Sequence, residues 1–201
     1  MVGWVNHGRD HTNRRFAADE VMISPSTVSR LKLKWEFSAG RDITATPAVA
    51  DGVVYFPCWN GYIYAVDAGD GSLVWKKKLE ELTGFRGTGL VANVTVTVSR
   101  ATPVVASPEL LIVGIYGPAA VAALHRWTGE LVWLTRLDSH FAAVVTMSGT
   151  AHDGLLTLFE TEVGLLEVAG LESIWGHLNQ TVVRLAQADE PPPACPRGSA
   201  T

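Results

Sequence analysis

The feature that most constrains the fold of this chain is an internal repeat. Residues 45–50, Ala-Thr-Pro-Ala-Val-Ala, recur as residues 101–106, Ala-Thr-Pro-Val-Val-Ala. Each copy opens a series of short apolar runs that ends in a tryptophan, Trp75 in the first copy and Trp133 in the second. Because self-similarity at a fixed spacing is typical of repeated supersecondary units, the sequence predicts a repetitive architecture.

The first copy has the pattern of an antiparallel meander. Asn-Gly and Asp-Gly pairs separate its β-rich runs, which are Val53–Phe56, Tyr62–Val66 and Ser72–Leu79. These pairs accept the positive φ angles of tight hairpin turns. Four short strands joined in this way form one blade of a β-propeller.

A second match lies at the end of each copy, where residues 65–75 parallel residues 123–133. Alanine, glycine and tryptophan keep their positions, and His125 replaces an aspartate. Alanine allows close approach of sheets, glycine makes the turn, and the indole fills and pins the gap between neighbouring sheets. We therefore expect two successive four-stranded sheets, over residues 43–79 and 99–137. The alternative is that the tryptophans are ordinary core residues of an unrelated meander.

These motifs resemble the tryptophan-docking pattern of the quinoprotein alcohol dehydrogenases. Residues 59–65 and 97–103 resemble plant proteins that are similar to polyvinyl-alcohol dehydrogenase, and residues 4–35 resemble the amino-terminal strand that enters such propellers. The resemblance covers residues 1–150. It implies an all-β chain, an incomplete β-propeller of two blades plus that entering strand. It also implies pyrroloquinoline quinone (PQQ) and calcium as cofactors and alcohols as substrates.

The resemblance further indicates candidate cofactor-binding residues. Arg100 occupies the place where family members put an arginine against the quinone, and a planar guanidinium suits carboxylate or quinone oxygens. Thr44 is the corresponding position in the first repeat. The alternative is that Arg100 caps the connection over residues 80–99 or pairs with a surface acid. We assign no catalytic and no metal-binding residue, because the family's calcium ligands and catalytic aspartate come from later blades.

The pattern changes after residue 150. Apolar residues between 151 and 190 have a spacing nearer to a helix than to an alternating strand, so this tail is expected to be atypical for the family and to favour helix. Residues 191–201 are rich in proline and are expected to be disordered. We interpret the change as the mark of a truncated or alternatively spliced product, or of a gene-model error.

Three hypotheses about function are consistent with these patterns. The chain could be a PQQ-dependent alcohol dehydrogenase, or a non-catalytic propeller that serves as a protein-interaction module. The third hypothesis is that it has no independent activity, because two blades and an entering strand leave open the sheet edges and apolar blade faces that a closed ring would cover. A protein partner that binds these open faces is a further expectation. We take the enzyme family as the best label for the chain and the third hypothesis, inactivity of this chain alone, as its best description.

Composition excludes other classes. A net charge of −4 without a large basic cluster argues against nucleic acid as a partner. No apolar run reaches the roughly 18–20 residues that span a bilayer, and the first ten residues lack the order of a signal peptide. The sequence does not determine the cellular compartment, and the resemblance implies a secretory or extracellular location.

Cys58 and Cys195 form no CxxC motif, and Cys58 is expected to be a small buried hydrophobe.

Overall fold

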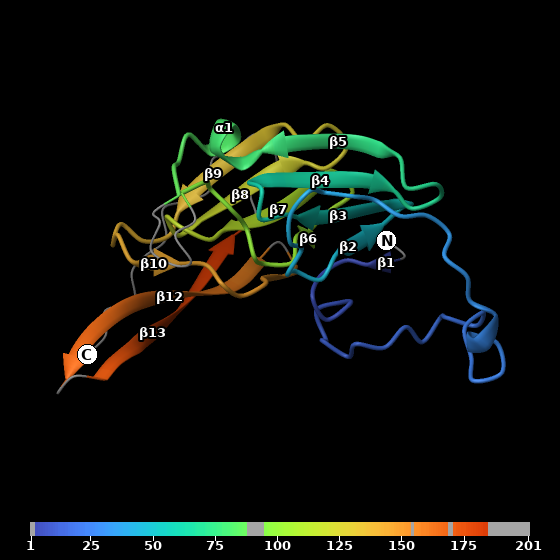
Figure 1. The fold of residues 1–201 in the computed structure, drawn as a ribbon, viewed down its shortest axis with the longest axis horizontal. Coiled ribbons are helices and arrows are strands. Elements are labelled where there is room, and N and C mark those ends of the chain that lie inside the picture. Colours follow the sequence, from blue (N-terminus) through green and yellow to red (C-terminus); the bar gives the residue numbers. More distant parts are fainter. Residues whose placement is uncertain (1–2, 88–94, 154, 169–170, 185–201) are drawn as a thin grey trace.

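The structure, a computed structural model, describes residues 3–87, 95–153, 155–168 and 171–184. Its body consists of three antiparallel sheets that follow one another in chain order (Figure 1). Within these described ranges, two short helices interrupt the connections, a 3-10 helix at Val28–Arg30 and α1 at Leu79–Thr83. The architecture is therefore almost entirely β, as the repeat predicts.

The first sheet contains five strands in the order β1 to β5. They are β1 (Gly3–Trp4), β2 (Ala48–Ala50), β3 (Val53–Pro57), β4 (Tyr62–Asp67) and β5 (Leu73–Lys78). The turn between β2 and β3 has positive φ at both Asp51 and Gly52, 48° and 78°, which is the conformation that the Asp-Gly pair predicts. The predicted meander is confirmed, and β1 adds a fifth strand beside β2.

The second sheet repeats this arrangement with four strands. They are β6 (Val104–Val105), β7 (Leu110–Ile115), β8 (Ala120–His125) and β9 (Leu131–Arg136). Ala65 pairs with Trp75 in the first sheet, and Ala123 pairs with Trp133 in the second. A register shift follows each of these pairs at the same position. Trp75 and Trp133 therefore occupy equivalent positions in their sheets, as predicted, and the register shift beside each of them is also equivalent.

Tryptophans join neighbouring units by one repeated contact. The indole Nε1 of Trp75 donates to the carbonyl oxygen of Arg126 at 2.9 Å, and that of Trp35 donates to the carbonyl oxygen of Ala68 at 3.0 Å. Ala68 and Arg126 occupy the same position in their repeats. A Cβ atom added at Gly71 would lie 2.7 Å from the Trp35 ring, and one at Gly129 would lie 2.8 Å from the Trp75 ring. Both turns need glycine because the docked indole lies directly against the backbone.

The third sheet corrects one prediction. It comprises β10 (Ala143–Val144), β11 (Thr150–His152), β12 (Leu155–Val168) and β13 (Leu171–Arg184), and β12 pairs with the other three. The expected helix within residues 151–190 is therefore wrong. Apolar spacing alone does not separate a buried strand from a helix, and pairing with β10, β11 and β13 decides the outcome. The expectation of disorder over residues 191–201 falls outside the described residues, and the domain boundary at residue 150 stays a prediction.

The main core lies between the first two sheets. It includes small and large side chains from both, among them Tyr55, Ile63, Trp75, Leu111 and Leu124. A second cluster packs the second sheet against the third, with Val121, Ala143, Val145 and Leu156 buried. Ala120, Ala122 and Ala123 of β8, each 0% exposed, allow this close approach on both faces. The sheets therefore stack face to face like successive blades.

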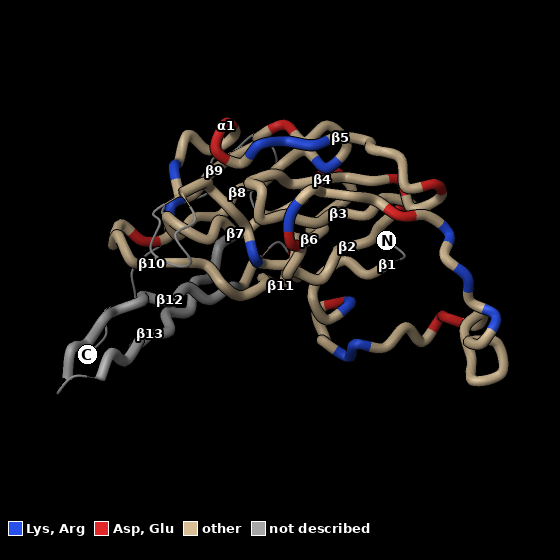
Figure 2. Tube along the Cα trace, in the orientation of Figure 1, with Lys and Arg blue, Asp and Glu red and all other residues tan. Residues whose placement is uncertain are grey.

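The surface has a mixed charge. Lysine, arginine, aspartate and glutamate are interspersed along most of the trace, and one basic run, Lys76–Lys78, lies on β5 (Figure 2). Within the described ranges, no helix has the length and apolar character needed to cross a membrane. The chain between residues 15 and 35 extends away from the sheets (Figure 1).

Candidate functional site

An open pocket of about 330 Å³ lies beside the segments that lead into β2, β6 and β11. Its lining comes from three equivalent segments, directly before β2, β6 and β11, and from the amino-terminal segment. The lining residues are His7, Thr44, Ala45, Thr46, Arg100, Thr102, Thr146, Met147 and Ser148. A volume near the lower end of the usual ligand range, about 300–1,000 Å³, suits a compact ligand. The pocket is therefore the space that the three equivalent segments surround.

Arg100, one of the two residues predicted from the sequence, lies in this pocket and contacts two aromatic rings. Its guanidinium carbon lies 5.9 Å from the ring centre of Trp59 and 5.4 Å from that of Tyr116. Among the described residues, no carboxylate lies within ion-pair distance of Arg100. An exposed cation held by aromatic faces keeps its N–H donors available to a ligand.

Thr44, the other predicted residue, lines the same pocket, and a hydrogen bond fixes the direction of its hydroxyl. The Nε1 of Trp59 donates to Thr44 Oγ1 at 2.9 Å. Because an indole N–H only donates, Thr44 must accept here, and its own hydroxyl hydrogen is left to point elsewhere. Thr44 therefore presents a donor to the pocket.

Ser148 repeats this arrangement at the third segment. The backbone N–H of Thr102 donates to Ser148 Oγ at 2.8 Å, so the hydroxyl hydrogen of Ser148 is also left for another acceptor. This bond joins the turns before β6 and β11. The pocket wall thus combines one guanidinium with two hydroxyls that can donate.

His7 enters the pocket from the loop that follows β1. Arg15 Nη2 lies 3.0 Å from His7 Nε2. Since a guanidinium can only donate, Nε2 is the acceptor, and the hydrogen of a neutral His7 ring is on Nδ1. The contact therefore selects one tautomer of the imidazole that faces the pocket.

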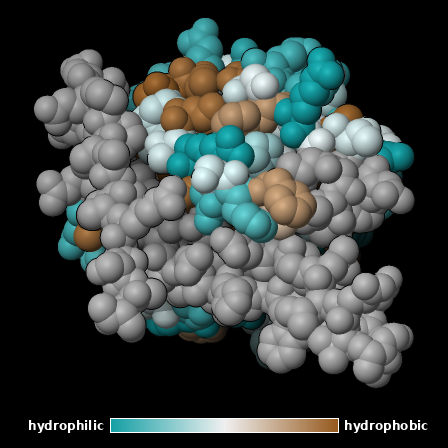
Figure 3. Space-filling view, turned by 90° about the vertical axis from the view of Figure 1, so that its left-hand side faces the viewer, coloured by the Kyte–Doolittle hydropathy of each residue, from teal (hydrophilic) through white to brown (hydrophobic). Residues whose placement is uncertain are grey.

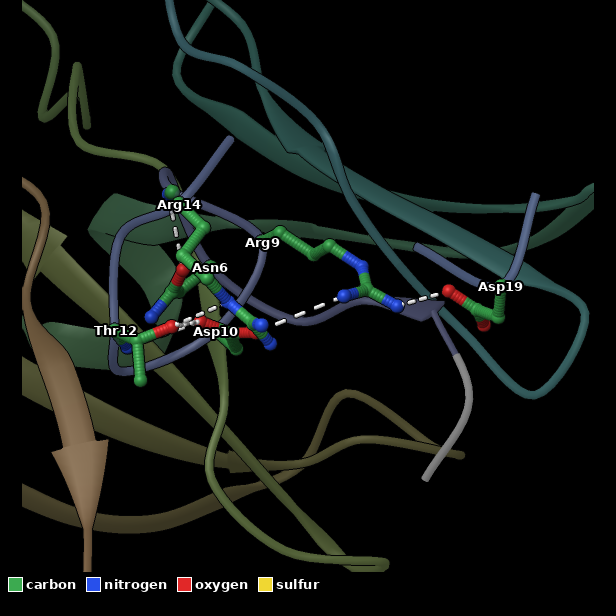
Figure 4. Close-up of polar contacts among 7 residues, drawn as sticks. Asn6, Arg9, Asp10, Thr12, Arg14 and Asp19 are labelled. Carbon is green, nitrogen blue, oxygen red and sulfur yellow. Dashed lines mark hydrogen bonds and ion pairs between the residues drawn. The ribbon is translucent and has the colours of Figure 1, made fainter. Parts of the chain in front are cut away.

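A polar network organises the loop that carries His7 (Figure 4). Arg9 pairs with Asp19, and Arg14 Nη2 lies 3.3 Å from Asp10 Oδ2. The backbone N–H of Thr12 donates to Asp10 at 2.9 Å, and its hydroxyl also donates to this carboxylate. The hydroxyl of Thr12, its backbone N–H and the guanidinium of Arg14 together lower the pKa of Asp10 to about 2. Asp10 is therefore an ionised structural acceptor at neutral pH.

Apart from Arg100 and Thr44, sequence reasoning assigned none of the lining residues to a site, among them His7, Thr146 and Ser148. The segment 146–148 occupies the position of residues 44–46 and 100–102, but it reads Thr-Met-Ser instead of Thr-Ala-Thr or Arg-Ala-Thr, and Gly149 replaces the proline that follows. The signal that could have found it is the Asp153-Gly154 pair, which falls at the distance at which Asp51-Gly52 follows the first segment. His7 carries no repeat signal, because it lies outside the repeat.

The described residues do not fit a calcium site. No carboxylate is among the residues that line the pocket, and the part of the chain covered by the structure has no group of three or more histidine, cysteine or acidic side chains that could hold a metal. Calcium prefers 6–8 oxygen ligands, largely carboxylates and carbonyls.

Cys58 is fully buried, as expected, and its thiol lies 3.3 Å from the carbonyl oxygen of Arg41.

Two family models match this chain. One, described as "Glucose/ethanol/alcohol dehydrogenase, beta-propeller domain", covers residues 4–89. The other, described as "Outer membrane protein assembly factor BamB", covers residues 59–167, more than half of the 201 residues. Both matches fall on the sheets that form the pocket. The chain therefore belongs to the PQQ-type β-propeller family, as the resemblance predicts.

Individual relatives agree with this assignment. A quinohemoprotein alcohol dehydrogenase of Pseudomonas putida is 36% identical over 75 residues, which are 36% of this chain and 10% of the relative. The polyvinylalcohol dehydrogenase of a Pseudomonas species is 26% identical over 153 residues, 76% of this chain and 22% of the relative. This chain thus spans between 10% and 22% of the length of these two relatives.

A solved structure supports the fold. The quinohemoprotein alcohol dehydrogenase from Comamonas testosteroni superposes with a TM-score of 0.63 at 22% sequence identity. The superposition covers 79% of this chain and 23% of that one. At this identity, the likeness establishes the arrangement of the sheets alone.

Proposed function

We propose that this chain forms one wall of the quinone site of a PQQ-dependent alcohol dehydrogenase. One observation carries the proposal. Arg100 and the hydroxyls of Thr44 and Ser148, whose hydrogens are left to donate, line one pocket. The described lining of this pocket contains no carboxylate. A cation beside neutral donors favours a ligand that carries ionised carboxylates and carbonyl oxygens. PQQ is a planar quinone with several carboxylates, so it fits this set of donors.

The roles of the residues follow from their chemistry. Arg100 binds a carboxylate or quinone oxygen through its fork of N–H groups, and Thr44 and Ser148 donate single hydrogen bonds. When bound, the quinone supplies the hydride acceptor for alcohol oxidation. No residue of this chain is assigned as the base, and no step is assigned to calcium. Since catalysis needs the acceptor, the base and the substrate held together, the chain alone is expected to be inactive.

A second function is favoured by a separate observation. The family model that covers residues 59–167 is described by an outer-membrane assembly factor, not by a dehydrogenase. The side of the molecule on which β9 and β10 lie also shows an apolar area between hydrophilic residues (Figure 3). A non-catalytic propeller that binds another protein is therefore the alternative.

Calorimetry with PQQ separates the two functions. The dehydrogenase function predicts measurable binding to the full chain, with an affinity that falls about tenfold or more in Arg100→Ala, because a lost bond to a charged group costs about 1.5–3 kcal/mol. Arg86→Ala is the matched control, since this side chain is 89% exposed and pairs only with Glu80 among the described residues. It should leave the affinity unchanged.

Turnover measurements complete the test. With PQQ, calcium, an alcohol and a dye acceptor, this chain should show no oxidation. Equal quinone affinity with and without Arg100 would reject the assigned site. Quinone-dependent turnover that disappears in Arg100→Ala would reject the expected inactivity and support the site. A folded, monodisperse chain that binds no quinone would favour the protein-interaction function.

A further inference from the structure

Trp59 does not line the pocket, yet it contacts both residues that the sequence predicts there. We infer that Trp59 is a positioning residue that directs the donors of Thr44 and Arg100 toward an acceptor group of the ligand. This inference rests on the proposed function, because it concerns the same pocket. It goes beyond the proposed function in two ways. It assigns a role to a residue that does not line the pocket, and it names the kind of ligand group that the pocket binds, one whose oxygens only accept hydrogen bonds.

The first contact fixes Thr44. Trp59 lies between β3 and β4, and its backbone N–H donates to the carbonyl oxygen of Asp42 at 3.0 Å. Its indole Nε1 donates to Thr44 Oγ1 at 2.9 Å. Trp59 is thus bonded to the segment before β2 through both its backbone and its side chain. The indole bond consumes one acceptor position of Thr44 and leaves the hydroxyl hydrogen for the ligand.

The second contact fixes Arg100. The rings of Trp59 and Tyr116 lie 6.3 Å apart at 54° to each other, and the guanidinium carbon of Arg100 lies within 6 Å of both ring centres. That distance is within the range of cation–π attraction. Tyr116 is buried in a small cluster with Val98 and Val144, and Trp59 packs on that cluster. The guanidinium is therefore positioned by two side chains that are themselves packed.

The two contacts together determine which ligands the pocket selects. Thr44 and Ser148 each accept a hydrogen bond from the protein, and Arg100 has only donors. A carboxylate or quinone oxygen can accept from all three. A group that only donates, such as an ammonium, cannot bind Arg100 and would find only the one remaining acceptor position on each of the two hydroxyls. The pocket is thus built for anionic or carbonyl oxygens.

The test compares variants of the full chain by their affinity for PQQ. Trp59→Phe keeps a ring near Arg100 but removes the N–H that orients Thr44, and it should weaken binding about threefold to tenfold, the range for one neutral hydrogen bond. Trp59→Leu also removes the aromatic face and should weaken binding by a further twofold to fivefold, about the strength of an exposed cation–π contact.

A double-mutant cycle distinguishes positioning from a general structural role. If Trp59 acts through Thr44, then Thr44→Val in the Trp59→Phe background should have almost no additional effect. Additive losses would overturn the inference. Trp127→Phe is the matched control, because it removes an indole bond to the Pro108 carbonyl and alters a cation–π contact with Arg126, at residues that do not line the pocket. This control should leave the affinity unchanged.

A measurement without ligand keeps the two proposals separate. In nuclear magnetic resonance spectra, Trp59→Leu should shift the side-chain N–H signals of Arg100, because the ring current of Trp59 is lost, and Trp127→Phe should not. If the parent chain fails to bind PQQ, the proposed function fails while this measurement still decides whether Trp59 positions Arg100. Unchanged Arg100 signals in a folded Trp59→Leu variant would overturn the inference.

Discussion

Trp75 and Arg126, 51 residues apart, are joined by a hydrogen bond of 2.9 Å from the indole Nε1 to the carbonyl oxygen. The bond connects β5 of the first sheet to the turn after β8 of the second. The indole is 8% exposed and lies against the turn glycine, Gly129. Trp35, in the segment before β2, makes the same contact with Ala68. The equivalent indole Nε1 of Trp133 is buried without a hydrogen-bond partner among the described residues, so this bond attaches the first two units and not the second sheet to the third.

Replacing the docked indole should destabilise the chain strongly. Trp75→Ala is expected to lower the free energy of unfolding by about 3–5 kcal/mol, because it leaves a cavity between two sheets. Trp75→Phe should cost less, as it retains most of the apolar area but loses the bond to Arg126. Denaturant unfolding measures both variants. A Trp75→Ala variant within about 0.5 kcal/mol of the parent, the range of neutral surface substitutions, would show that the ring attaches nothing.

Gly129 should tolerate no side chain. Its φ is 71°, and an added Cβ would lie 2.8 Å from the Trp75 ring. We expect Gly129→Ala to cost about 2–4 kcal/mol, combining left-handed strain with displacement of the indole. The matched control is Gly40→Ala, with φ of 84° and no atom within 4 Å of the added Cβ; it should cost only the strain, about 1–2 kcal/mol. Equal losses of unfolding free energy in the two variants would contradict the docking role of Gly129.

The side chain of Arg126 forms a second link between the same sheets. It is fully buried, and its Nη2 lies 2.5 Å from Asp51 Oδ2 in the turn between β2 and β3. Asp51→Asn preserves the shape of the turn but removes the negative charge, and it should cost about 1–3 kcal/mol, less than a fully buried pair because Asp51 is partly exposed.

A double-mutant cycle checks this pair. Arg126→Met combined with Asp51→Asn should cost clearly less than the sum of the single substitutions, as measured by thermal or denaturant unfolding. Glu109→Gln serves as the control, since its carboxylate is 66% exposed beside His125. Strict additivity would show that the two charges do not stabilise each other.

The amino-terminal loop should respond to acid through Asp10. Its pKa, lowered to about 2, lies below the ordinary value, so the ionised form is favoured in the folded loop. The stabilisation is complete above the ordinary pKa of roughly 3.9 and is lost as the pH falls through the folded value. Thr12→Val removes the hydroxyl donor and should raise the pKa of Asp10, as followed by the carboxyl carbon signal in a pH titration. An identical titration in parent and variant would contradict the assigned cause.

The repeated part of this protein can be predicted from its amino-acid sequence. Asp51-Gly52 specifies a hairpin turn locally, and the equal spacing of Trp75 and Trp133 specifies equivalent positions in two sheets, because each signal depends only on residues within one repeat. Arg100 is predicted from the resemblance to the family, and Thr44 is predicted because it occupies the same position in the preceding repeat.

Features that depend on residues far apart in the chain follow from the three-dimensional fold and not from local sequence patterns. The strands β12 and β13 replace the expected helix because their backbone groups pair with other strands, which apolar spacing does not encode. The burial of Arg126 depends on Asp51 in the preceding sheet, and arginine is otherwise mostly exposed. The roles of His7, Ser148 and Trp59 arise because three separate turns and one loop meet at a single pocket. Such contacts join residues far apart in the chain, so no local pattern predicts them.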